Sequence, residues 1–139
     1  MSRDERSFLE REIPGRYEHV GSVTVERLSE FYNRASCLVY ISSYEGFGIP
    51  IVEAMKAGCP VVALRKSSLP EAGGSAAIYI ETASEGDLVQ AIRRLEHPDV
   101  RRRAIEEGVA WAARFSWDES VRRLAEFQTE VQVRRHARG

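Results

Sequence analysis

The sequence predicts an α/β fold with a doubly wound parallel sheet. Three short segments, at residues 37–42, 60–64 and 76–81, are apolar almost throughout and rich in β-branched or aromatic residues. Such runs are typical of strands that are buried on both faces. Apolar residues at helical spacing occur between and after these runs. Alternation of such strands with helices is the pattern of a parallel sheet that helices cover on both sides.

Length and composition predict one soluble domain over residues 1–139. The chain has 43% hydrophobic and 29% charged residues, and no linker rich in Gly, Pro or Ser divides it. Its formal net charge of -1 predicts no attraction to nucleic acid. No apolar run approaches the ~20 residues that span a bilayer, and the charged N-terminus lacks a signal-peptide core. We therefore expect a cytoplasmic protein without an integral membrane segment, in which Cys37 and Cys59 are buried and reduced.

The N-terminal part is expected to hold a helix, a short strand and a second helix. Pro14 ends the first helix, because proline followed by glycine breaks helical structure. Residues 17–23, with the sequence YEHVGSV, are a candidate for a short strand. Residues 25–36 place apolar side chains at helical spacing, which predicts a helix that leads directly into the strand at residues 37–42.

The next unit is a helix over residues 49–58 and the strand that follows it. Pro50 stands where proline is favoured, in the first helical turn, and Gly58 is a natural C-terminal stop. Beyond the strand at residues 76–81 the chain is expected to be helical. The expected helices cover residues 84–97, 98–115 and 116–135.

The C-terminal helices carry regularly spaced apolar and aromatic residues. Trp111 and Phe115, four residues apart, are expected to anchor a helix in the core. In the last helix, further apolar residues recur at helical spacing, so this helix either packs on its own domain or offers an apolar stripe to another chain. These residues are Trp117, Val121, Leu124 and Phe127.

The segment SSYEGFGIPIVEAMKAGCPVV, residues 42–62, contains the candidate binding site. It follows a buried strand, and ligands of α/β sheets bind at the carboxyl ends of the strands. A helix that begins near Ile49 leaves backbone N–H groups unpaired, which suits a phosphate. Gly46 and Gly48 leave room for a ligand close to the backbone, and either one could supply a positive φ.

Two carboxylates, Glu45 and Glu53, flank this turn and indicate what lies beside the phosphate. A fixed negative charge repels phosphate, so these groups are expected to accept hydrogen bonds from hydroxyls, which occur in pairs on sugars and ribose. A sugar on one side of a diphosphate and a ribose on the other matches this arrangement. The pattern therefore predicts a nucleotide-sugar site. The alternative for Glu53 is stabilisation of the helix dipole alone, worth about 0.3–1 kcal/mol.

The motifs EGFG, EAM, AGCPVV, SSLPE and RFSWDES occur in an order that resembles the C-terminal domain of GT-B glycosyltransferases of the family 4 type, the glycosyl transferases group 1. The signature of that family is a pair of glutamates separated by seven residues, which Glu45 and Glu53 match. The resemblance covers residues 17–130. It implies a Rossmann-like sheet that forms one GT-B half-domain, with a helical C-terminus.

The resemblance also implies roles for individual residues. Glu45 would contact the donor sugar as the catalytic residue, and Glu53 would hold the ribose hydroxyls. The backbone near Phe47 would lie by the donor phosphates. The implied donor-binding set is Glu45, Gly46, Phe47, Gly48, Ile49 and Glu53. A turn that borders the donor pocket would comprise Ser68, Leu69, Pro70 and Glu71.

The implied reaction is a retaining transfer of a hexosyl group from a nucleotide-sugar, in polysaccharide or glycoconjugate biosynthesis. The family's donor domain uses no metal, and this chain has no D-x-D pair. No cofactor is implied, because the nucleotide-sugar is itself the donor substrate.

A GT-B enzyme has two Rossmann-like domains, and 139 residues are too few for both. We expect the N-terminal acceptor domain to be a partner chain or domain. We also expect the first strand–helix unit to be absent, in which the family has an Arg and a Lys that bind the diphosphate. Arg65 and Lys66 either approach the pocket or form a solvated basic pair. The chain alone is expected to be inactive. The alternatives are a non-catalytic nucleotide-sugar binding module and a GT-B-like epimerase or phosphorylase.

Overall fold

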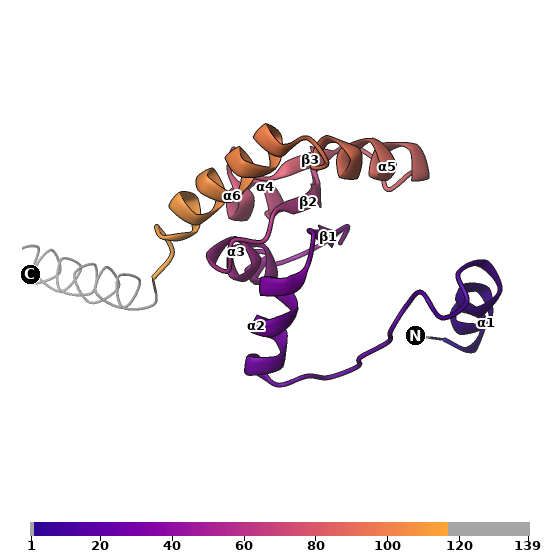
Figure 1. Ribbon diagram of the computed structural model, residues 1–139. Coiled ribbons are helices and arrows are strands. Elements are labelled where there is room, and N and C mark those ends of the chain that lie inside the picture. Colours follow the sequence, from indigo (N-terminus) through magenta and orange to yellow (C-terminus); the bar gives the residue numbers. More distant parts are fainter. Residues whose placement is uncertain (1, 117–139) are drawn as a thin grey trace, which may run out of the picture.

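A computed structural model describes residues 2–116 of the chain. The helix expected over residues 116–135, with the apolar stripe from Trp117 to Phe127, lies outside the described residues except for Ser116. In order, the described elements are α1 (Arg3–Glu12), α2 (Val25–Arg34), β1 (Leu38–Tyr40), α3 (Ile49–Lys56), β2 (Val61–Leu64), α4 (Leu69–Gly73), β3 (Ile78–Ile80), α5 (Glu85–Arg94) and α6 (Pro98–Ala112). This order confirms the predicted α/β fold (Figure 1).

The sheet consists of three parallel strands in the order β1-β2-β3. Leu38 of β1 pairs with Val61 of β2, and Val62 pairs with Ile78 of β3. Every residue of β2 is buried, as expected for a central strand with helices on both faces. The three apolar runs of the sequence therefore form one sheet.

Helices cover the two faces of the sheet unequally. The hydroxyl of Tyr79 donates to the carbonyl of Leu69 at 3.3 Å, so the face on which Tyr79 lies is the face of α4. Ile78 and Ile80 point to the other face, because side chains alternate along a strand, and there α5 packs on β2 and β3. This second face has less cover at β1, because Val39 is 38% exposed whereas its neighbour Val62 is 0% exposed.

The first helix stands apart from the rest of the fold, and α1 contains no buried residue (Figure 1). Its N-cap is Ser2, which forms a capping box with Glu5. The strand predicted over residues 17–23 is wrong: this segment is an extended linker without strand pairing. A strand needs a neighbouring strand for its backbone hydrogen bonds, and in the described part of the chain none lies beside it.

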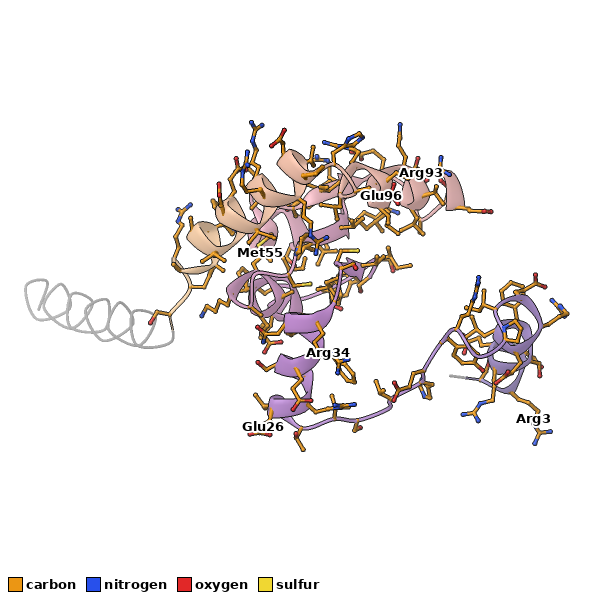
Figure 2. All side chains as sticks on the ribbon, in the orientation of Figure 1. Arg3, Glu26, Arg34, Met55, Arg93 and Glu96 are labelled. Carbon is orange, nitrogen blue, oxygen red and sulfur yellow. The ribbon has the colours of Figure 1, made fainter. Side chains whose placement is uncertain are left out.

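The core lies where α3 packs against the sheet, α4 and α6. Met55 is 1% exposed and points into this interior, as Figure 2 shows. A Cβ added to Gly108 of α6 would lie 3.4 Å from Met55 Cγ, so the glycine allows the two helices to approach. Gly58 has a φ of 71° and ends α3, as the sequence predicts.

The two cysteines have free thiols, as the sequence predicts. Cys59 is buried and Cys37 is half-buried, and burial raises the pKa of each thiol. None of the helices within residues 2–116 has the length and apolar character to cross a bilayer. The SSLPE segment, read from the sequence as a turn, forms the short helix α4 with Pro70 in its first turn.

Candidate functional site

The loop between β1 and α3 brings the predicted site residues to the carboxyl edge of the sheet. It leaves β1 at Tyr40 and enters α3 at Ile49. Glu45 and the two glycines are on this loop, and Glu53 lies one turn into α3. The loop therefore lies at the carboxyl end of a strand, as the sequence predicts, but β1 is not buried on both faces as expected, because Val39 is 38% exposed.

Glu45 is held from two sides. The hydroxyl of Tyr40 donates to Glu45 Oε1 at 2.7 Å. The hydroxyls of Ser67 and Ser68 donate to the backbone carbonyl of Glu45 at 3.1 and 3.0 Å. No ion pair of the described residues includes Glu45. The carboxylate is therefore fixed in position, half-buried, and still has its second oxygen, Oε2, for a ligand.

The loop after β2 is the second wall of the site. Ser67 has a φ of 51°, the left-handed region that costs a non-glycine residue about 1–3 kcal/mol. This conformation and that of Ser68 direct both hydroxyls at Glu45. The turn predicted to border the donor pocket thus contacts the glutamate loop directly through Ser68, whereas Glu71 is exposed in the first turn of α4.

The start of α3 depends on Gly48. Its φ is 96°, and it is the N-cap residue without a side-chain cap. A Cβ at this position would lie 3.0 Å from Leu69 Cδ2 and 3.3 Å from Ala72 Cβ, so both the backbone conformation and the space require glycine. Of the two predicted alternatives for positive φ, Gly48 is the residue that has it, and Gly46 does not.

Consecutive backbone N–H groups at this turn have no hydrogen-bond partner among residues 2–116. No residue within the described range accepts a hydrogen bond from the N–H of Gly46, Phe47, Gly48 or Ile49. Pro50 has no N–H, and the N–H of Ile51 donates to the carbonyl of Gly48 at 3.0 Å. The donors for an anion are thus located in the loop and at the first helical residue rather than deeper in the helix.

Gly46 differs from Gly48 in what surrounds it. A Cβ added to Gly46 would meet no atom within 4 Å. Neither packing nor backbone conformation therefore explains a glycine at this position. A glycine there leaves the backbone open to close approach by a ligand.

The Phe47 side chain turns away from the loop toward the end of α6. Its ring lies edge-on to Phe115, with 5.5 Å between the ring centroids, and Phe115 in turn lies 6.1 Å from Trp111. Trp111 Nε1 donates to the carbonyl of Ala72 at 2.9 Å. Trp111 and Phe115 pack against the core as predicted, but both are half-buried and Phe115 lies beyond the end of α6. This aromatic cluster leaves only the backbone of Phe47 for a ligand.

Glu53 lies on the exposed side of α3 and faces α2. The hydroxyl of Tyr32 is 3.4 Å from Glu53 Oε2 and donates to it. Glu53 lines a groove of about 420 Å³ between α2 and α3, and Glu45 is not among the residues that line this groove. Lys56, one turn further along, donates to the carbonyl of Phe115 and does not pair with Glu53. The structure fixes both carboxylates with tyrosines but does not enclose them in one cavity.

Arg65, the first residue of the basic pair after β2, is engaged elsewhere. Arg65 Nε lies 2.8 Å from Glu81 Oε1, and its guanidinium carbon is 4.5 Å from the centre of the Tyr79 ring. Lys66 is exposed. Of the two alternatives that the sequence left open, the structure favours a solvated pair over a pair that approaches the loop.

The two tyrosines that hold the carboxylates predict a loss of stability at alkaline pH. Burial, together with the negative charge of Glu53, raises the pKa of Tyr32 to about 12, and burial with the hydrogen bond to Glu45 raises that of Tyr40 to about 12. A raised pKa favours folding while the phenol is protonated. The stabilisation is therefore complete below pH 10.0, the usual tyrosine pKa, and is lost as the pH rises to about 12.

Urea denaturation across this pH range measures the effect. We expect the free energy of unfolding to fall less steeply with pH in Tyr32→Phe than in the wild type. Tyr44→Phe is the matched control, because Tyr44 is 85% exposed. An equally steep fall in Tyr32→Phe would contradict the assignment.

Comparison with known proteins identifies the family. The family profile described as glycosyl transferases group 1 matches residues 3–111, which include the whole glutamate loop and Glu53. The chain belongs to the group 1 glycosyltransferases. The resemblance seen in the sequence is therefore confirmed, and the parallel sheet is that of a GT-B half-domain.

Curated relatives of this group 1 glycosyltransferase chain are much longer than the chain itself. O-antigen chain mannosyltransferase B of Escherichia coli is 39% identical over 106 residues, which are 75% of this chain and 28% of that protein. D-inositol 3-phosphate glycosyltransferase of Acidothermus cellulolyticus is 35% identical over 98 residues, which are 69% of this chain and 22% of that protein. O-antigen chain mannosyltransferase RfbU of Salmonella typhimurium is 30% identical over 115 residues, which are 82% of this chain and 31% of that protein. The chain thus spans about a quarter of the length of such relatives.

Proposed function

We propose that this chain is the donor-binding part of a glycosyltransferase and binds a nucleotide-sugar across the loop at residues 45–49. The observation that carries the proposal is the run of unpartnered N–H groups between two carboxylates that tyrosines hold in place. The N–H groups from Gly46 to Ile49 suit the diphosphate. Glu45 accepts hydrogen bonds from the donor sugar, and Glu53 accepts them from the ribose.

The hydrogen bond from Tyr40 supports the proposed role of Glu45. It occupies one carboxylate oxygen and leaves the other to accept from a sugar hydroxyl. As the bond from the sugar to the diphosphate breaks, positive charge develops on the sugar and negative charge on the leaving diphosphate. A fixed carboxylate stabilises the first and backbone N–H groups stabilise the second. Retention of configuration and independence of metal are proposed from the family.

We also propose a partner domain and the biosynthetic process in which the chain acts. Because the chain spans only part of its relatives, the acceptor site and the cations for the diphosphate come from an N-terminal partner domain, without which the chain is inactive. The names of two relatives refer to O-antigen chains and mannosyl transfer. We therefore propose hexosyl transfer in cytoplasmic assembly of a polysaccharide or glycoconjugate.

A non-catalytic binding module is the second candidate. The observation in its favour is that Arg65 pairs with Glu81 and is therefore not available as a cation for the diphosphate. A partner that supplies cations restores turnover under the first proposal. Under the second, the donor binds and no glycosyl group moves when the partner is added.

A titration followed by amide NMR tests the proposal on the chain alone. We expect a nucleoside diphosphate to shift the amide signals of Gly46, Gly48 and Ile49, and its sugar conjugate to shift those of Tyr40 and Glu45 in addition. Sodium sulfate at equal ionic strength is the control for a simple anion effect. Equal responses to sulfate, diphosphate and conjugate, or none, would contradict donor binding.

A further inference from the structure

The outer edge of β3 is open in the part of the chain that the structure describes, because β3 is the last strand of the sheet. The carbonyl of Ile80 accepts from the N–H of Arg65 at 2.8 Å, so the backbone groups of Ile80 point toward β2. In a parallel strand the backbone groups of successive residues point to opposite sides. The N–H and C=O of Tyr79 therefore point away from the sheet. The sequence of β3, Ile-Tyr-Ile, contains no charged residue or proline that would protect this edge.

Two grooves run along this edge and meet at Tyr79. The first, of about 500 Å³, lies between β3 and the first half of α6, where Arg103 and Glu107 line it. The second, of about 280 Å³, lies between β3 and α5, where Asp87 lines it. Tyr79 and Arg94 line both grooves. An extended segment that pairs with β3 therefore has a groove for its side chains beside each of the two helices.

The carboxyl end of β3 carries an excess of negative charge. Glu81 follows the strand and lines the second groove together with Asp87, and Glu85 begins α5. Arg65 pairs with Glu81 at 2.8 Å and offsets one of these three charges. The amino end is balanced, because two arginines and two carboxylates line the first groove there. These residues are Arg94, Arg103, Asp99 and Glu107.

Residues 130–135 of this chain, with the sequence EVQVRR, have the pattern that this edge requires. Val131 and Val133 alternate with polar residues, which is the period of a strand with one apolar face, and valine favours strands. Two arginines follow, and they complement the acidic carboxyl end of β3. This segment lies outside the described residues.

The chain between α6 and this segment is long enough to reach β3. The first half of α6 lines the groove beside β3, whereas the carbonyl of Phe115, past the end of α6, accepts from Lys56 of α3. The chain must therefore return along α6, whose 15 residues span about 22 Å. Residues 117–129 span up to about 43 Å when they are extended.

We propose that residues 130–135 pair with β3 in parallel and form a fourth strand of the sheet. Gln132 lies opposite Tyr79 in this register. The N–H of Tyr79 donates to the carbonyl of Val131, and the N–H of Val133 donates to the carbonyl of Tyr79. The inference is independent of the proposed function, because no residue of the glutamate loop lines either groove.

Charge sets the direction of the proposed strand. In the parallel direction Arg134 lies opposite Glu81. Arg135 lies opposite Thr82, whose hydroxyl donates to Asp87. The antiparallel direction would place both arginines at the amino end of β3, where no excess of negative charge attracts them.

A segment of the same chain is favoured over a separate peptide, because covalent attachment gives it an effective concentration in the millimolar range at β3. The helix expected over residues 116–135 then ends before Glu130.

Amide hydrogen exchange of the complete chain tests the pairing. We expect the Tyr79 amide to exchange at least about 100-fold more slowly in the wild type than in Val133→Pro, because proline removes the N–H that donates to Tyr79. Gln132→Pro is the matched control. The N–H of Gln132 points away from β3 in the proposed register, and an edge strand accepts proline at such a position. Its Tyr79 amide should therefore exchange at the wild-type rate.

A charge reversal tests the direction. The double variant Arg134→Glu/Arg135→Glu should speed exchange of the Tyr79 amide at least about tenfold, the ratio that 1.4 kcal/mol gives. Arg138→Glu is the control, because Arg138 lies beyond the proposed strand. Circular dichroism, together with slow exchange of the Val62 amide in the central strand, establishes that each variant is folded.

Fast exchange of the Tyr79 amide in the wild type, or equal effects of the two prolines, overturns the proposal. A charge reversal without effect overturns the parallel direction and with it the proposed register. Sedimentation identifies the occupant: protection that requires a dimer would place the segment of one copy on β3 of another, which also overturns the proposal. The test involves no nucleotide, so its outcome leaves the proposed function unchanged.

Discussion

Replacement of Glu45 by glutamine is expected to lower the affinity for a nucleotide-sugar about 10- to 100-fold and to leave the affinity for the nucleoside diphosphate unchanged. A hydrogen bond to a charged group is worth about 1.5–3 kcal/mol, and each 1.4 kcal/mol is a factor of ten in affinity. Glutamine keeps one oxygen to accept from Tyr40, so the loop stays in place. Its NH₂ group cannot accept from a sugar hydroxyl, which is the role proposed for Glu45 Oε2.

Glu53→Gln is the matched comparison, because Glu53 also accepts from a tyrosine. Its proposed ligand is the ribose, which the diphosphate and the conjugate share. We therefore expect Glu53→Gln to weaken both ligands to a similar extent. Calorimetric titration of both variants with both ligands measures this division. Equal losses for both ligands in both variants would refute the assignment of Glu45 to the sugar.

The sheet could be predicted from the sequence because burial leaves a local signal. Residues 60–64 are apolar throughout, and β2 is buried along its whole length. Gly58 and Pro50 mark the ends of α3, because each residue has a conformational preference that acts within one turn. Where structure depends on nearby residues alone, the sequence is sufficient.

The strand expected at residues 17–23 is wrong because strand formation does not depend on nearby residues alone. Its pattern suits a strand, but a strand forms only when another strand pairs with it, and the described part of the chain supplies none. The same argument applies in reverse to β1, whose outer edge has no neighbouring strand among residues 2–116.

The sequence predicts the residues of the candidate site but not the side chains that hold them in place. Glu45, Glu53 and the glycines stand out by residue type and spacing. Tyr40 and Tyr32 hold the two carboxylates, and Ser67 holds the backbone carbonyl of Glu45. Tyr32 and Glu53 are 21 residues apart, and Ser67 and Glu45 are 22 apart, so their contacts depend on how the elements pack. A tyrosine at the carboxyl end of an apolar strand, such as Tyr40, is the one signal that the sequence offered.

The two glycines of the loop predict opposite effects on stability and binding. Gly48→Ala is expected to destabilise the protein by about 1–3 kcal/mol, because alanine at a φ of 96° is strained. Its methyl group would also lie 3.0 Å from Leu69 Cδ2, and Leu69 is fully buried in the core and cannot move aside freely. Urea denaturation should show a lower midpoint with an unchanged slope.

Gly46→Ala separates folding from binding, because a Cβ there meets no atom of the protein within 4 Å. We expect its free energy of unfolding to stay within about 0.5 kcal/mol of the wild type. Its affinity for the nucleoside diphosphate should nevertheless fall, since the methyl group would occupy the space through which phosphate reaches the backbone N–H groups. Unchanged affinity in Gly46→Ala would mean that the diphosphate does not lie against this loop, whereas reduced stability would mean that the glycine serves the fold.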